Sequence, residues 1–152
     1  MNKMKILIFL IAIFSIFMIS CIATVESNNS SSDDSINWND YNELLKEVGS
    51  NLDELKILIG DKVNYEKNKK EIISKLNDLQ KKVDEVVDAD VPKSDVELKN
   101  KIDECMKKLA EGAKNANEGI NSDKKELLEK ADNLFKEGVN NLNTFLNGSK
   151  QQ

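Results

Sequence analysis

A regular spacing of apolar residues constrains the fold of this chain more than any other feature of its sequence. Within residues 36–60, apolar side chains recur alternately three and four positions apart, at Trp38, Tyr41, Leu45, Val48, Leu52, Leu55 and Ile59. Residues spaced in this way lie on one face of an α-helix, whereas a half-buried strand alternates at every second residue. We therefore expect a helix over residues 39–59, with Gly60 as its C-terminal cap.

Three further segments repeat this pattern and are separated by residues that end or begin helices. The second stripe runs from Tyr65 to Val87 and precedes Pro92, the only proline of the chain. Ser94 and Glu97 are spaced as in a capping box, which predicts the start of a third helix. Residues 121–123 then predict the N-terminal cap of a fourth helix that ends at Gly148.

Short connections between these helices predict the architecture. The expected loops are residues 60–64, 91–94 and 119–121, and loops of this length join antiparallel neighbours. We predict an all-α fold, an antiparallel up-down four-helix bundle over residues 36–148. A three-helix bundle with a loosely packed first helix is the alternative. Acid-before-lysine pairs four residues apart indicate solvated outer faces: Glu66–Lys70, Glu71–Lys75, Asp78–Lys82, Asp103–Lys107, Glu104–Lys108, Glu126–Lys130 and Asp132–Lys136.

The first 20 residues have the pattern of a secretory signal. Two lysines precede Ile6–Ile19, fourteen residues that are apolar apart from Ser15 and too few for a comfortable membrane span. The following sequence, Met18-Ile19-Ser20-Cys21, resembles a bacterial lipobox, in which a small residue precedes the modified cysteine. The resemblance implies cleavage before Cys21 and attachment of palmitate-type acyl chains there, which would anchor the protein stably in a lipid bilayer.

The segment after Cys21 differs in character from the rest of the chain. Residues 22–35 include ESNNSSSDDS, which contains too little apolar surface to form a core. We expect residues 21–35 to be a lipidated flexible tether that lifts the bundle off a membrane, and residues 149–152 to be a frayed tail.

The residue types that are missing exclude several functions. The chain has no histidine and no arginine, so the usual neutral-pH acid–base group and the bidentate phosphate-binding group are absent. The apolar stripes contain almost no charged residues from which an internal site could be built. Without residues 1–20, 20 lysines face 27 acids, a net charge of −7 that disfavours nucleic-acid binding. We expect no enzyme activity, no cofactor and no metal site; the acidic residues around Pro92 lack the spacing of a calcium loop.

Lysines supply the candidate ligand-binding residues. Lys62, Lys67, Lys69 and Lys70 form the densest basic patch, and pairs at 107–108 and 124–125 are smaller. If two of these groups converge in the fold, they could engage a sulfated glycosaminoglycan or an acidic host protein. Flanking acids favour the simpler interpretation of a solvated surface.

Two other side chains have alternative interpretations. Cys105 lies in the third stripe, where it fits a small buried apolar residue, and an intermolecular disulfide that links a homodimer is the alternative. Trp38 fits the first stripe as a core residue, but it also stands next to the tether, where an exposed aromatic could contact a partner.

Taken together, the leader MKILIFLIAIFSIFMISC, the Ser/Asn/Asp tether and the lysine-rich helical body resemble the small helical outer-surface lipoproteins of Borrelia spirochaetes. This resemblance implies a non-enzymatic virulence protein, anchored in the outer membrane at the cell surface, that binds a host protein or matrix component. The alternative is a structural lipoprotein that self-assembles and faces the periplasm or the surface.

Overall fold

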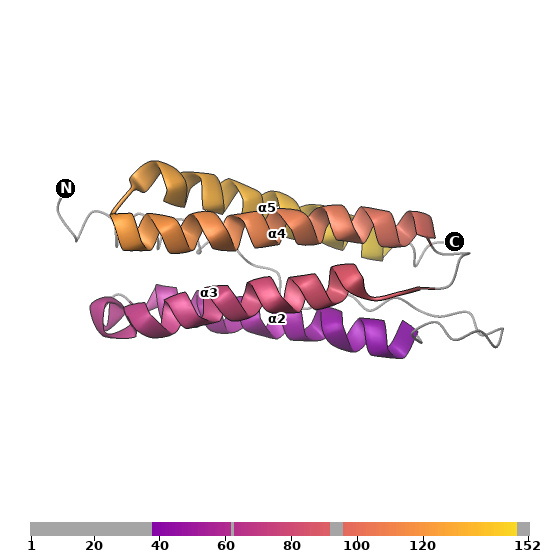
Figure 1. The fold of residues 1–152 in the computed structure, drawn as a ribbon, viewed down its shortest axis with the longest axis horizontal. Coiled ribbons are helices and arrows are strands. Elements are labelled where there is room, and N and C mark those ends of the chain that lie inside the picture. The colour runs from indigo at the N-terminus through magenta and orange to yellow at the C-terminus, as the bar shows by residue number, and fades with distance from the viewer. Residues whose placement is uncertain (1–37, 62, 92–95, 149–152) are drawn as a thin grey trace.

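The computed structural model describes residues 38–61, 63–91 and 96–148. They form four helices: α2 (Trp38–Gly60), α3 (Tyr65–Asp88), α4 (Val96–Ser122) and α5 (Lys125–Gly148). Successive helices run in opposite directions (Figure 1). The predicted all-α fold, an antiparallel four-helix bundle, is confirmed for these residues.

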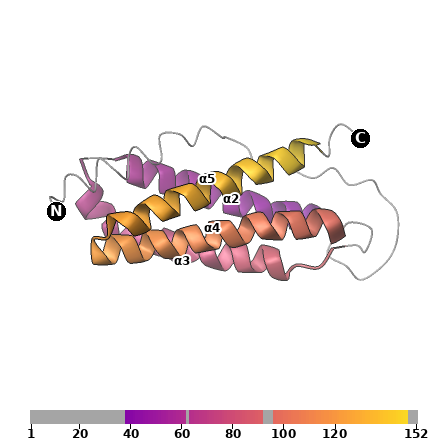
Figure 2. The ribbon, with the colours of Figure 1, turned by 90° about the horizontal axis from the view of Figure 1, so that it is seen from above.

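The helices form two layers, each of which is a helical hairpin. The pair α2 and α3 makes one layer, and the pair α4 and α5 makes the other (Figure 1). Contact between the layers is made chiefly by α3 against α4, and α5 is inclined to α4 when the bundle is seen from above (Figure 2). Both short turns, α2–α3 and α4–α5, lie at the same end of the bundle, which we call the hairpin end. The N-terminus of α2 lies at the opposite end.

The predicted apolar stripes form the core between these layers. In α2 the six stripe residues from Tyr41 to Ile59 are buried, so the first helix is a full member of the bundle. The side chain of Trp38 lies outside the described residues. Largest among the fully buried side chains are Tyr41, Phe135, Leu45, Leu55, Ile59 and Ile72.

Glycines allow α4 and α5 to approach closely. A methyl group added at Gly138 would lie 2.8 Å from Leu109 Cδ2 and 3.1 Å from the carbonyl oxygen of Cys105. At Gly112 it would lie 3.1 Å from the Phe135 ring. The small residues of the third stripe therefore mark a helix–helix contact, as one of the two interpretations of the sequence predicted.

The position of the α4–α5 turn corrects a sequence prediction. Residues 121 and 122 extend α4 instead of capping α5, and Ser122 Oγ donates to the Glu118 carbonyl oxygen at 2.6 Å. Asp123 then adopts a left-handed φ of 52°, and the Lys124 N–H donates to the Gly119 carbonyl oxygen at 3.1 Å. This is a Schellman motif, which closes a helix by its own backbone bonds. The turn lies at residues 123–124 instead of the predicted 119–121, and Asp123 can occupy it because Asp, like Asn, tolerates the left-handed conformation that the motif requires.

The other helix ends differ in smaller ways from the prediction. Gly60 is the last residue of α2, and no described glycine has a positive φ, so α2 ends without a left-handed glycine cap. Asp61 instead donates its N–H to the Ile57 carbonyl oxygen at 3.2 Å. Ser94 of the predicted capping box lies outside the described residues, and α4 is described from Val96.

Candidate functional site

The first turns of α3 carry the predicted basic patch to the hairpin end. Lys67 and Lys70 are exposed and Lys69 is half-buried, which agrees with a lysine stem that lies along the apolar seam. Lys62 and the predicted lipid attachment site, Cys21, lie outside the described residues.

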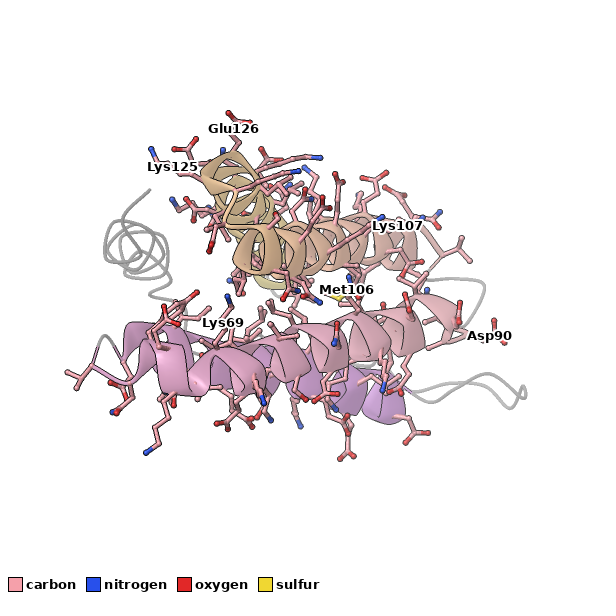
Figure 3. All side chains as sticks on the ribbon, turned by 60° about the vertical axis from the view of Figure 1, so that its left-hand side comes forward. Lys69, Asp90, Met106, Lys107, Lys125 and Glu126 are labelled. Atoms are coloured by element: carbon pink, nitrogen blue, oxygen red, sulfur yellow. The ribbon has the colours of Figure 1, made fainter. Side chains whose placement is uncertain are left out.

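A second basic cluster lies at the same end because α4 and α5 turn there. Lys125 and Lys69 lie toward the same end of the bundle, whereas Lys107 lies toward the other (Figure 3). The α4–α5 turn also lies near the start of α3, because Asp123 of this turn acts on Tyr65. Burial is the main cause that raises the pKa of Tyr65 to about 12, and the charges of Glu66 and then Asp123 add to it. The fold thus places residues 67–70 and 124–125, two of the three lysine groups seen in the sequence, at the same end of the bundle.

Acids and two apolar side chains give the hairpin end a mixed character. Lys125 pairs with Glu129 at 3.0 Å, and hydrogen bonds from Asn64 lower the pKa of Asp61. Ile57 is 72% exposed and Val63 is 92% exposed. Mixed charge around exposed apolar groups resembles a protein contact surface more than the uniformly cationic surface that a polyanion selects.

A polar groove of about 390 Å³ runs along the outer side of α2 and α3. Its lining comes from Glu47, Ser50, Asn51 and Glu54 of α2 and from Lys75, Asp78, Lys81, Lys82 and Glu85 of α3. Nothing in the sequence pattern marked this groove, because the residues come from two helices whose register only the fold determines.

Ion pairs cross the groove at two levels. Glu47 pairs with Lys82 at 2.5 Å, and Glu54 pairs with Lys75. Asn51 lies between the two levels on α2 and is 4% exposed, and its buried Oδ1 accepts no hydrogen bond. A buried oxygen without a hydrogen-bond donor costs about 1–3 kcal/mol, so this amide is energetically unfavourable, whereas the ion pairs on either side of it are satisfied.

A buried charge cluster lies at the end of the bundle opposite the hairpin end. Lys99 Nζ donates to both carboxylate oxygens of Asp103, at 2.7 and 2.6 Å, and to the Val87 carbonyl oxygen at 2.8 Å. The same ammonium lies 5.9 Å from the centre of the Tyr41 ring, whose pKa is raised by burial and then by Asp103. This cluster joins α2, α3 and α4, and its two charged residues lie beside the predicted apolar stripe of α4 instead of within it.

Cys105 lies inside the core with 1% of its surface exposed, as the simpler interpretation of the sequence expected. Burial raises the pKa of its thiol to about 11, which leaves very little thiolate at neutral pH. A disulfide between two chains would require the α4–α5 contact to open first.

The described residues contain neither a candidate metal-binding cluster nor a candidate membrane-spanning helix. Within the ranges that the structure describes, no group of three or more His, Cys, Asp or Glu side chains is arranged to hold a metal ion. No helix in the same ranges combines the length and apolar character that a membrane crossing requires.

Comparison with known proteins does not place the chain in a family. No family model, no curated protein and no solved structure matches it. Its function must therefore be inferred from its own residues.

Proposed function

We propose that this protein is a lipid-anchored bacterial outer-surface lipoprotein that binds a host protein or matrix component, without enzymatic activity, through its hairpin end. The observation that carries the proposal is the position of that end. It gathers two lysine groups and two exposed apolar side chains, and it lies opposite the N-terminus of α2, where the predicted tether enters the bundle.

The chemistry of the hairpin end favours a protein as the partner over a glycosaminoglycan. Ile57 and Val63 provide apolar contact area at the hairpin end, and acids such as Asp61 and Asp123 lie near the lysines. A sulfated polysaccharide would be repelled by these carboxylates, whereas a protein surface with interspersed charges can complement them.

Self-assembly through the first helix has less support. The stripe that would pair with a second copy is the stripe that α2 buries within its own bundle. Sedimentation of residues 36–152 should therefore show a monomer; a stable dimer would favour the structural alternative. This fragment contains every described core residue, from Tyr41 to Leu146, and we expect it to fold on its own.

Two experiments test the proposal. Protease treatment of intact cells should remove the protein; its survival would contradict the surface location. Residues 36–152 should capture a specific protein from serum or matrix extract, and the double variant Ile57→Ser/Val63→Ser should lose it. The control is Val96→Ser, which removes an exposed apolar side chain from the first residue of α4, at the other end of the bundle. Equal capture by both variants would exclude the hairpin end.

A further inference from the structure

We propose that the buried Lys99–Asp103 pair is a register lock between the two helical hairpins, and that it positions the two lysine groups of the hairpin end relative to each other. The register is the turn of α4 that lies against a given turn of α3. The proposal concerns the geometry of the bundle, so it goes beyond the proposed function and does not depend on which partner the hairpin end binds.

Each hairpin has its own means of fixing the register of its two helices. In the α2–α3 hairpin, ion pairs cross between the helices at two levels. In the α4–α5 hairpin, large side chains lie against glycines, as Phe135 does against Gly112. Short connections, residues 61–64 and 123–124, also hold each pair of helices together. Between the hairpins, α3 and α4 are joined through the longer segment 89–95, so their register needs another determinant.

Apolar packing alone leaves the register of α3 against α4 open. From its second turn onward, α3 buries aliphatic side chains of similar size that recur every three or four positions: Ile72, Leu76, Leu79, Val83 and Val86. A shift of one helical turn would therefore replace one aliphatic contact with a similar one. A buried polar group with a specific partner does distinguish the two registers, because it loses that partner when the helix moves.

Lys99 is such a group, and only 8% of its surface is exposed. Its Nζ donates to the Val87 carbonyl oxygen of α3 at 2.8 Å and lies 5.9 Å from the centre of the Tyr41 ring of α2. Asp103, one turn further along α4, holds the ammonium group with both carboxylate oxygens. A shift of one turn would move Nζ by about 5.4 Å. Because free carbonyl groups occur only in the last turn of α3, the shifted ammonium group would find no equivalent acceptor within that helix.

Two further hydrogen bonds between α3 and α4 are consistent with the same register. Gln80 Nε2 donates to the Ala110 carbonyl oxygen at 3.4 Å, and Asn117 Nδ2 donates to Asn77 Oδ1 at 2.8 Å. The first of these bonds is long and the second is exposed to water, so each contributes little to the choice between registers. The buried ammonium group of Lys99 should therefore contribute most of it.

The register also sets the geometry of the hairpin end. Lys69 belongs to the α2–α3 hairpin and Lys125 to the α4–α5 hairpin, and both lie toward that end (Figure 3). A shift of α4 along α3 would move one lysine group past the other, because each hairpin moves as a unit. The buried pair thus positions residues at the opposite end of the bundle that it does not touch.

Distance measurements between two spin labels in residues 36–152 test the proposal. Labels at Lys67→Cys on α3 and Glu126→Cys on α5 report on the two hairpins, because both positions are exposed. Cys105→Ala removes the remaining thiol of this fragment. We expect one narrow distance distribution in this labelled parent protein, which corresponds to a single register.

Two variants release the lock. Lys99→Met/Asp103→Leu, and also Lys99→Met alone, should add a second distance, shifted by up to about 5 Å, in about one tenth or more of the molecules. The control Glu97→Leu/Lys101→Met removes an exposed pair with the same spacing on the same helix and should keep the single distance.

Three results would overturn the proposal. The first is a single unchanged distance in either folded variant of Lys99. The second is the same additional distance in the control, which would reduce the effect to a general loss of charge on α4. The third is loss of helical circular dichroism in both variants of Lys99, which would make the pair a requirement for folding instead of a register lock.

Discussion

Replacing Lys99 with methionine should lower the free energy of unfolding by about 3 kcal/mol, although lysine is ordinarily a surface residue. The ammonium group bonds both oxygens of Asp103 and the Val87 carbonyl oxygen, and only 9% of its side-chain surface is exposed. Methionine has a stem of similar size but no donor. The substitution therefore removes the charge without opening a cavity.

The magnitude follows from the groups that lose their partner. Removing one member of a buried pair costs about 3–5 kcal/mol, because the other charge stays buried without compensation. The Asp103 side chain is 15% exposed, so some water reaches it and the lower end of that range applies. Val87 lies in the last turn of α3, where carbonyl groups have no partner within their own helix, so its oxygen is also left without a donor.

Urea unfolding of residues 36–152, followed by circular dichroism, measures this loss. The matched control is Lys101→Met, which removes an ammonium group that lies on the same helix and pairs with Glu97 at 2.7 Å. Because the Lys101 and Glu97 side chains are 47% and 85% exposed, that change should cost no more than about 0.5 kcal/mol. The double variant Lys99→Met/Asp103→Leu should recover most of the stability, because neither charge then stays buried alone. Equal losses for Lys99→Met and Lys101→Met would refute the reasoning.

Three further predictions concern the α4–α5 hairpin and its thiol. In thermal melts, Gly138→Ala should destabilise the protein by about 1–3 kcal/mol, because the added methyl group would lie 2.8 Å from Leu109 Cδ2. The control Gly60→Ala should not destabilise it, because a methyl group at that position has no neighbouring atom within 4 Å. In the same assay, Asp123→Val should lower the free energy of unfolding by about 1–2 kcal/mol, because residue 123 has a left-handed φ of 52° that a β-branched side chain disfavours. Asp123→Gly should leave it unchanged, and equal effects of the two substitutions would contradict the left-handed turn. Cys105 should resist iodoacetamide at pH 8 until urea unfolds the chain. The pKa of the Cys105 thiol rises on folding from 9.0 to about 11, so the unfolded chain loses this proton first as the pH rises. The free energy of unfolding should therefore fall between pH 9 and pH 11. Cys105→Ala should remove the contribution of this thiol to the fall, and an unchanged pH profile in the variant would contradict the shift.

The fold was largely predictable because each helix carries its own periodic signal. Tyr41, Leu45 and Val48 are buried as their spacing required. The α4–α5 turn was misplaced because Ser122 and Asp123 are common both in N-terminal caps and in turns, and local sequence does not distinguish these uses. Only the backbone bond from Lys124 to Gly119 decides between them.

The candidate sites were less predictable because they combine residues from different helices. The lysines at 67–70 were found from their density, but their position at the same end as Lys125 depends on both turns lying at that end. The sequence pattern singled out neither Asn51 nor Lys99. In each case the informative fact is burial, which depends on the neighbouring helix.

The surface ion pairs also divide into those that sequence spacing predicts and those that only the fold reveals. Of the predicted pairs within single helices, Asp132–Lys136 forms at 2.6 Å. Lys75, Lys82, Lys108 and Lys130 instead bond acids on neighbouring helices, at Glu54, Glu47, Glu137 and Glu111. A long lysine side chain reaches across a helix pair as easily as along one turn, so sequence spacing alone does not select its partner.

The sequence by itself determined that this chain forms amphipathic helices, where most of them begin and end, and which catalytic groups it lacks. These properties are local, since a residue's spacing and type set them without reference to distant parts of the chain. Only the tertiary structure decided which lysines meet, which charges are buried and where a groove remains. Those properties depend on the register and orientation of one helix against another, which the packing of the whole core determines.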